Sequence, residues 1–275
     1  MGTWFAGYFF SKGFSTVLSD VRIEEARDSA RELGVELASD NVSAVQGADI
    51  ALICVPIAKT GEVISEVAPY MRTGAVLAEI SSIKRNAVSA LRQATTLGMQ
   101  PLSIHPMFGP TAEAIDGKTM IVVPVVDKEA EESIARNLFE GAEIKVAALD
   151  EHDRAMAATL SLTYFMNIAF AKVLTGDDLL LLKQLSGTTF AVQLTLAESV
   201  VNEDPQLLEA LLKENPYSMN YIDKFVFEAE NMKGLLEERD STCRLFAFLK
   251  DFFERDPEFS LAEERRYKAF TALKG

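Results

Sequence analysis

The sequence predicts an α/β fold in two parts: a domain with a mostly parallel sheet over residues 1–150, and an all-α domain over residues 151–275. Two observations lead to this prediction. In the first part, short apolar runs rich in β-branched residues alternate with helical patterns of about 10–15 residues, which is typical of β-α-β units. After Asp150 no convincing strand pattern recurs, and long helical patterns take over.

The strands of the first part are expected where apolar and β-branched residues cluster. These runs are 15–19, 49–55, 75–80, 101–104, 119–125 and 143–148. Helical patterns separate most of them, at 3–12, 22–33, 60–71, 84–95 and 128–139. The run 49–55 is apolar almost throughout, as expected for a parallel strand that helices cover on both faces. The arrangement predicted is a Rossmann-like sheet.

The second part reads as helices only. Its helical patterns are broken at Gly176, Gly187, Pro205, Pro216 and Pro257. The segments 179–182 and 207–212 are strongly apolar. Such segments belong either to an ordinary core within the chain or to a face covered by a second subunit, and the pattern alone leaves both open.

Composition excludes several kinds of partner. The 275 residues include 27 basic and 41 acidic side chains, a net charge of −14, so we expect no nucleic acid held by phosphate contacts. The two cysteines, Cys54 and Cys243, are too few for a disulfide framework or a four-cysteine zinc site, and no metal is expected. Without a long apolar run or a secretory signal pattern, we expect a cytoplasmic protein with no membrane partner.

The N-terminus begins at a helix start. In a dinucleotide-binding unit, a strand leads into G-x-G-x-x-G, and the following helix N-terminus binds the pyrophosphate. Gly2 fits the third glycine, whereas the strand and the first two glycines are absent. We expect about ten further residues upstream that supply them; the alternative is a chain that has lost cofactor binding.

Asp20 strengthens the cofactor hypothesis. It follows the run 15–19, at the position expected for a carboxylate that binds the adenosine ribose hydroxyls of NAD. The alternative is a helix cap for the segment that follows. Val55 and Pro56 end the run 49–55 at the edge of the sheet where such ligands bind, so they are further candidates for cofactor binding.

Ser82 lies in a second loop at the same edge, after the run 75–80. A serine pair followed by a lysine is also a common helix N-cap, so Ser82 is either a site residue or structural. Several nearby cations are expected to be solvated surface charges: Lys84, Arg85, Lys118 and Arg154.

The chain has two histidines, His105 and His152. His105 leaves the run 101–104 in a segment stiffened by two prolines and a glycine, SIHPMFGP at 103–110. A histidine near its ordinary pKa is suited to act as a general base at neutral pH. A lone histidine is more often structural, and the stiff setting makes both interpretations of His105 equally reasonable.

Residue by residue, the segment 103–110 resembles the signature of the prephenate dehydrogenase family. The resemblance extends to the segments 2–13, 48–57, 81–84 and 151–153. It covers essentially the whole chain, and it is specific in the first part and weaker in the helical part. It implies a Rossmann domain joined to a helical domain through which members form homodimers.

The family resemblance also implies an activity. Members use NAD or NADP to convert prephenate to 4-hydroxyphenylpyruvate with loss of CO2, or act on the amino analogue arogenate, in tyrosine biosynthesis. On this chain, His105 would be the general base for the C4 hydroxyl and Ser82 the active-site serine. Asp20 favours NAD, because a carboxylate there repels the 2′-phosphate of NADP.

Three weaker candidates come from the same resemblance. Gly109 and Thr163 are possible substrate contacts. His152 matches a histidine linked in some members to feedback inhibition by tyrosine, with a structural role at a helix terminus as the alternative. The family's cationic residues for the substrate carboxylates are missing from 160–165 and 186–191, so the choice between prephenate and arogenate stays open.

Two other functions remain to be weighed. A β-hydroxyacid-type dehydrogenase shares the layout, and it would need a catalytic lysine, for which Lys172 and Lys183 are the nearest candidates. A non-catalytic relative that senses an aromatic metabolite would keep the fold without turnover.

Overall fold

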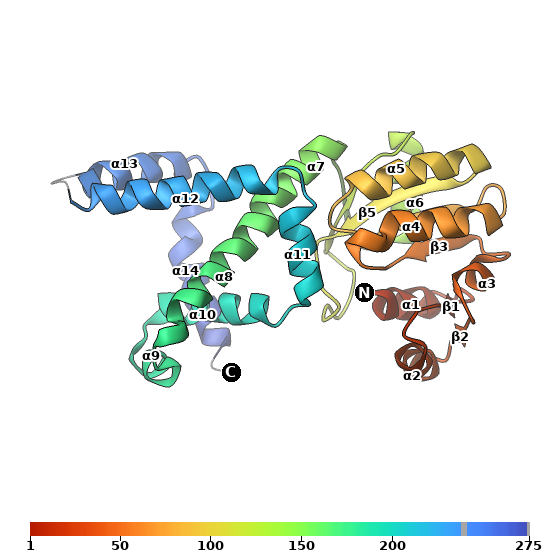
Figure 1. Ribbon diagram of the computed structural model, residues 1–275, viewed down its shortest axis with the longest axis horizontal. Helices are drawn as coiled ribbons and strands as arrows, with labels where there is room; N and C mark the ends of the chain where they lie inside the picture. The colour runs from red at the N-terminus through yellow and green to blue at the C-terminus, as the bar shows by residue number, and fades with distance from the viewer. Residues whose placement is uncertain (238–240, 274–275) are drawn as a thin grey trace. The chain divides into compact units, whose positions relative to one another are not determined.

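The chain forms two compact units, Met1–Met156 and Ala157–Gly275 (Figure 1). The computed structural model describes residues 1–237 and 241–273. The units divide at Met156, slightly beyond the boundary expected at residue 150, so His152 and Asp153 belong by their contacts to the first unit.

The first unit contains a five-stranded sheet, in the order β3 (Ile50–Ile53), β4 (Val76–Glu79), β5 (Gln100–Pro106), β6 (Thr119–Val122) and β7 (Glu143–Val146). All neighbours are parallel except β5 and β6, which are antiparallel. The predicted α/β class with a mostly parallel sheet is confirmed.

Strand β5 changes partners along its length. Its first half pairs with β4 as far as Glu79 opposite Ser103, and its second half pairs with β6 from Ile104 opposite Val122. The strand therefore runs to Pro106, beyond the expected end at residue 104.

Two short strands, β1 (Val17–Leu18) and β2 (Glu36–Leu37), form a separate parallel pair. β1 lies inside the expected run 15–19, whereas β2 and the short helix α3 (Asn41–Val45) were not expected, because two residues are too few to show a strand pattern. In the Rossmann strand order, the first strand lies between the two that correspond to β1 and β3. The sheet is thus interrupted where the expected N-terminal strand would pair, and that strand stays a prediction.

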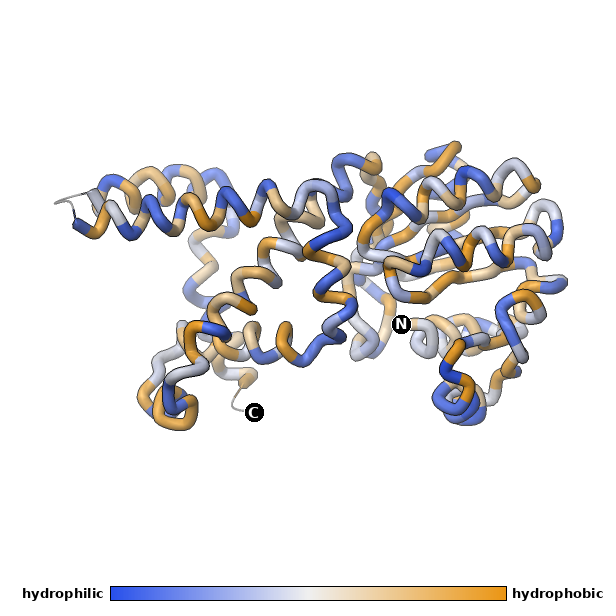
Figure 2. Tube along the Cα trace, in the orientation of Figure 1, coloured by the Kyte–Doolittle hydropathy of each residue, from blue (hydrophilic) through white to orange (hydrophobic). Residues whose placement is uncertain are grey.

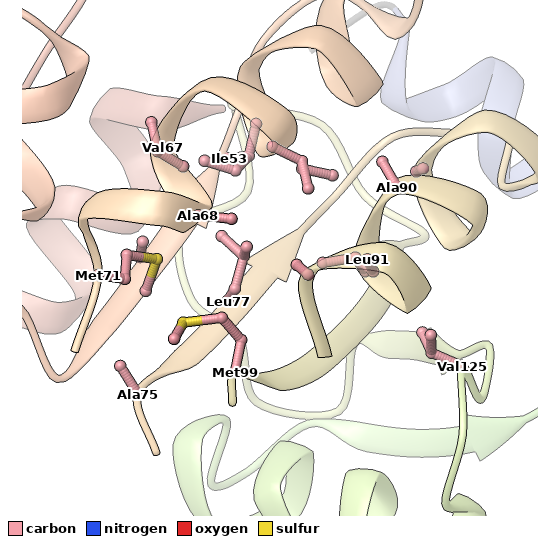
Figure 3. Close-up of a cluster of buried hydrophobic side chains, with 14 of the residues drawn as sticks. Ile53, Val67, Ala68, Met71, Ala75, Leu77, Ala90, Leu91, Met99 and Val125 are labelled. Atoms are coloured by element: carbon pink, nitrogen blue, oxygen red, sulfur yellow. The ribbon is translucent and has the colours of Figure 1, made fainter. Parts of the chain in front are cut away.

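Helices cover both faces of the main sheet (Figure 1). Their bounds are α1 (Gly2–Ser11), α4 (Ile57–Val67), α5 (Arg85–Ala94) and α6 (Lys128–Leu138), whereas α2 (Ile23–Leu33) packs on α1 and β2. Ile53 of β3 and Leu77 of β4 share a buried cluster with Ile64 of α4 and Leu91 of α5 (Figure 3). This cluster fixes the helices α4 and α5 on one face.

The opposite face carries a second buried cluster, built on Phe5 of α1 and Phe139 after α6. Leu102 and Ile104 of β5 point into it. Because successive strand residues point to opposite faces, Ser103 and His105 lie on the other face, the side of α4 and α5.

The second unit is helical throughout its described residues, 157–237 and 241–273. Helix α7 (Leu149–Met156) continues through a π-helical turn (Ala157–Leu162) into α8 (Thr163–Val173). The remaining helices are α9 (Leu179–Leu185), α10 (Thr188–Val201), α11 (Pro205–Lys213), α12 (Ser218–Leu235), α13 (Ser241–Phe253) and α14 (Ala262–Ala272). The predicted all-α second part is confirmed.

The stretch Leu149–Gly176 is long and apolar enough to cross a membrane, by length and composition alone. Core helices of soluble proteins pass the same test. Figure 2 shows apolar residues along this stretch, and α8 within it packs against α10. Its first turns carry the buried polar residues His152 and Asp153. The expectation of no membrane partner stays a prediction.

Candidate active site

His105 lies near the end of β5 and pairs with Ile121 of β6. Only 4% of the residue is exposed. The stiffness expected from its flanking prolines is reinforced by the β5–β6 ladder, which fixes the backbone on both sides of the ring.

The two histidines of the chain are in contact. His105 Nδ1 lies 3.0 Å from His152 Nε2, and His152 Nδ1 lies 2.9 Å from Asp153 Oδ1. His152 and Asp153 come from α7, and both are buried. A chain of three polar side chains thus runs from α7 to the end of β5.

A buried ion pair lies beside this chain. Lys84 Nζ is 2.7 Å from Glu79 Oε1, and neither side chain is exposed. The carboxylate of Glu79 also accepts hydrogen bonds from Ser103 Oγ at 2.5 Å and from Ser81 Oγ at 2.6 Å. A buried charge needs partners of this kind to offset its loss of hydration.

Lys84 links the ion pair to both histidines. Its ammonium donates to the carbonyl of Ile104 at 2.5 Å, directly before His105. Its backbone N–H donates to Asp153 Oδ1 at 3.1 Å. Lys84 therefore joins β4, β5 and α7 at one point.

The expectation that Lys84 is a solvated surface charge was wrong. A lysine before an amphipathic helix gives no sign of burial by itself. The available signal was Glu79, a carboxylate inside the apolar run 75–80, because a charge on a covered strand requires a cationic partner nearby. The exposed Arg85, paired with Asp150, does match that expectation.

The surroundings keep both rings neutral. Burial, followed by the positive charge of Lys84 and the neighbouring His152, lowers the pKa of His105 well below its ordinary value of 6.5. Burial also lowers the pKa of His152, whereas the hydrogen bond to Asp153 opposes that shift. At neutral pH, His105 is thus available as a base and not as an acid.

Ser82 is half-buried in the loop between β4 and α5. Within the described residues its hydroxyl makes no hydrogen bond, whereas the adjacent Ser81 is bonded to Glu79. Because Glu79 lies opposite Ser103 in the sheet, this loop emerges beside the end of β5 that carries His105. The role of Ser82 stays a prediction.

The candidate cofactor residues of the first helix and of β3 do come together. A Cβ added at Gly2 would lie 3.5 Å from Cys54 Cβ, so the N-terminus of α1 meets the carboxyl end of β3, where Val55 and Pro56 follow. Burial raises the pKa of Cys54 to about 12, so this thiol is a small apolar side chain here and not a nucleophile.

Asp20 lies beyond β1, partly exposed. Its Oδ1 accepts a hydrogen bond from the backbone N–H of Arg22 at 2.8 Å and lies 3.5 Å from Arg22 Nε. This turn precedes α2, but the N-cap of α2 is Arg22 and no side chain caps the helix, so Asp20 is not its cap. Both contacts use Oδ1 of Asp20. Binding of a ribose by Asp20 remains a prediction.

Of the three weaker candidates, His152 is part of the histidine chain, whereas Gly109 and Thr163 are both exposed. Gly109 is exposed in the loop after β5, where its carbonyl accepts from the N–H of Ala112 at 3.1 Å. Thr163 is exposed at the start of α8, in the second unit. Across residues 1–237 and 241–273, no three His, Cys, Asp or Glu side chains are grouped as a metal ion would require.

Comparisons with known proteins identify the family of the chain. Residues 5–148 match the nucleotide-binding domain of prephenate dehydrogenase, and residues 149–251 match its dimerization domain. The chain belongs to the prephenate dehydrogenase family. Together the two matches cover nearly all of the described residues.

Relatives and solved structures of the family resemble the chain over most of its length. A probable arogenate/prephenate dehydrogenase of Methanocaldococcus jannaschii is 28% identical over 246 residues, 87% of this chain and 55% of that protein. The chain therefore spans about half the length of this relative. Prephenate dehydrogenase of A. aeolicus, solved with hydroxyphenyl propionate and NAD+, superposes with a TM-score of 0.75 over 94% of both chains at 20% identity. Synechocystis arogenate dehydrogenase superposes with a TM-score of 0.70 over 93% of this chain and 95% of its own, at 18% sequence identity.

The buried ion pair leads to a stability prediction. Glu79→Gln leaves the ammonium of Lys84 buried without its counter-charge, and we expect a loss of about 3–5 kcal/mol in the free energy of unfolding. The matched control is Glu62→Gln, which removes an exposed partner of Lys59 at 2.8 Å and should change stability by less than about 1 kcal/mol. Urea denaturation of both variants measures the difference. Equal, small losses would show that the Glu79–Lys84 pair does not hold the first unit together.

Proposed function

We propose that this chain is an NAD-dependent dehydrogenase that oxidises and decarboxylates prephenate, with arogenate as the alternative substrate. The observation that carries the proposal is the setting of His105, a buried ring whose Nδ1 lies 3.0 Å from His152 Nε2, with burial lowering its pKa. Within the described residues its Nε2 makes no hydrogen bond, so this nitrogen is available to a substrate hydroxyl.

The residues at the carboxyl end of β3 fit a dinucleotide. Gly2 has no side chain to cover the backbone at the start of α1, as a pyrophosphate at a helix N-terminus requires, and it lies beside Cys54 at the end of β3. Val55 and Pro56 adjoin this point, and Asp20 would bind the ribose. When bound, NAD supplies the acceptor for the hydride from C4 of the substrate.

The protein's own part in the reaction is small and specific. His105 Nε2 accepts the proton of the C4 hydroxyl while C4 is oxidised to a ketone. The ketone is conjugated to the ring carbon that bears the carboxylate, so the electron pair of that carbon–carbon bond enters the ring and CO2 leaves. Ser82 would orient the same region. Because the ring becomes aromatic, the enzyme needs only to orient two reactants and to take one proton.

Neither candidate lysine of the β-hydroxyacid-type alternative has a setting that favours catalysis. Lys183 is exposed and paired with Glu198 at 2.7 Å, and Lys172 is exposed at the end of α8. Neither side chain is buried. The family match also favours the prephenate dehydrogenase reaction over this alternative.

Turnover tests the proposed activity directly. The protein mixed with NAD and prephenate should raise the absorbance of the reduced cofactor, and arogenate in a parallel assay decides the substrate. His105→Asn should lower kcat about 10²–10⁴-fold, because it removes the base, while the Kd for NAD measured by calorimetry stays nearly unchanged. An equal loss in both quantities would make His105 structural. Absent turnover with tight binding of tyrosine or arogenate would favour the metabolite-sensing alternative.

The low pKa of His105 sets the expected pH dependence. A base is active when deprotonated, so kcat/KM should stay level as the pH falls from about 8 to 6.5 and decline only at lower pH, where His105 gains its proton. Circular dichroism at each pH separates loss of the base from unfolding. A decline centred at 6.5 would contradict the effect of burial and of Lys84 on His105.

We further propose a homodimer formed through the second unit, whose residues match a dimerization domain. In α13, Phe246 and Leu249 lie on one face and are 68% and 39% exposed, more apolar surface than a solvated helix needs. Tyrosine as a feedback ligand and a cytoplasmic location belong to the same proposal and rest on the family resemblance.

A charge on α13 tests the dimer. Phe246→Glu should shift the mass in sedimentation from dimer toward monomer, because a carboxylate would be buried without a partner. Arg244→Glu, a change at an exposed and charged position on the opposite side of the same helix, is the control. If Phe246→Glu keeps the mass of the unaltered protein, α13 is not part of the contact.

A further inference from the structure

The contacts of His152 fix the positions of two protons. A carboxylate only accepts hydrogen bonds, so His152 Nδ1 must donate to Asp153 Oδ1 at 2.9 Å. A neutral imidazole carries one proton, which leaves His152 Nε2 as an acceptor. The hydrogen bond of 3.0 Å to His105 Nδ1 therefore takes its proton from His105, and His105 Nε2 carries the lone pair.

This arrangement orients His105 for the proposed reaction. It also determines which of the two rings can hold the proton taken from the substrate. If His105 alone kept a proton from the substrate, a positive ring would be buried near the ammonium of Lys84. The second ring lies against a carboxylate instead. The charged and titratable groups that act on the pair are Lys84 before α5, Glu79 on β4 and Asp153 on α7.

We propose that His105, His152 and Asp153 form a proton relay in which the final acceptor is His152. The inference rests on the proposed function for the identity of the proton donor. As the substrate O–H breaks, its proton bonds to His105 Nε2, and the Nδ1 proton of His105 passes to His152 Nε2. His105 ends neutral with its proton on Nε2, and His152 ends as an imidazolium paired with Asp153. His152 and Asp153 are positioning residues that act through His105.

The relay requires His152 to be a more favourable site for a proton than His105. Both rings are buried, yet only His152 touches a carboxylate. Lys84 repels a proton on either ring, while its backbone N–H holds Asp153 Oδ1 in place at 3.1 Å. The geometry thus directs positive charge away from the end of β5 and onto α7.

The chain offers a clean measurement, because its two histidines are the two rings of the relay. In protein labelled with ¹⁵N-histidine, NMR at pH 7 should show both rings neutral and protonated on Nδ1. On acidification, the first imidazolium should form on His152. A neutral His105 protonated on Nε2, an imidazolium on either ring at pH 7, or His105 titrating first would overturn the relay. None of these results depends on turnover, so failure of the proposed function is seen separately, in the activity assay.

Two variants assign the effect to named groups. Asp153→Asn removes the counter-charge while its amide oxygen can still accept, so His152 should titrate at lower pH than in the unaltered protein. Asp150→Asn, on the same helix but exposed and paired with Arg85, should leave the titration unchanged. Equal shifts in both variants would mean that general charge, and not the Asp153 contact, determines where the proton goes.

Solvent isotope effects test the second transfer. Two protons move together in the relay, so the dependence of kcat on the fraction of D2O should be curved. His152→Gln keeps an acceptor for His105 Nδ1 but takes no proton, and its dependence should become linear with a kcat lower by at least about tenfold. A linear dependence in the unaltered enzyme would show that the proton stops at His105.

Discussion

The interior pairing of Lys84 with Glu79 is the constraint on which the rest of the site depends. Two charges have been taken out of water, and the loss of hydration is offset by their attraction and by neighbouring hydroxyl and carbonyl groups. Those neighbours come from the loop after β4 and from β5, and the backbone N–H of Lys84 is bonded to Asp153 of α7. The pair can therefore be satisfied in one arrangement of β4, β5 and α7, which is the arrangement that brings the two histidines into contact.

A net charge of −14 is unfavourable for a protein that would bind a dianionic substrate and a phosphorylated cofactor. Lys84 is paired with Glu79 and adds no net charge, but its ammonium acts on His105 because buried charges are screened little by solvent ions. Burial first, and then the positive charge of Lys84, lower the pKa of His105. An ammonium with no solvent contact thus acts on the chemistry of a ring in a protein that is acidic as a whole.

The sequence predicted the fold and the position of His105 well, because both depend on local signals. Apolar runs mark the strands, and the prolines around His105 mark a stiff segment at a strand end. It did not predict the burial of Lys84 or the contact of His152 with His105. Both depend on which segments far apart in the chain become neighbours. No local sequence pattern predicts that β5 pairs first with β4 and then with β6. Glu79 was the one residue whose type conflicted with its surroundings and pointed to a hidden partner.

The change of partner within β5 has a consequence for how the site can vary. The parallel pairing with β4 ends at Ser103, and the antiparallel pairing with β6 begins at Ile104. The two kinds of pairing therefore meet between adjacent residues of β5. Side chains alternate between faces with every residue. A slip of one position in either ladder would turn His105 toward the aromatic cluster around Phe5 and bring Ile104 to the place of the base. Loops around the site can change in length, whereas the spacing within β5 cannot change by a single residue.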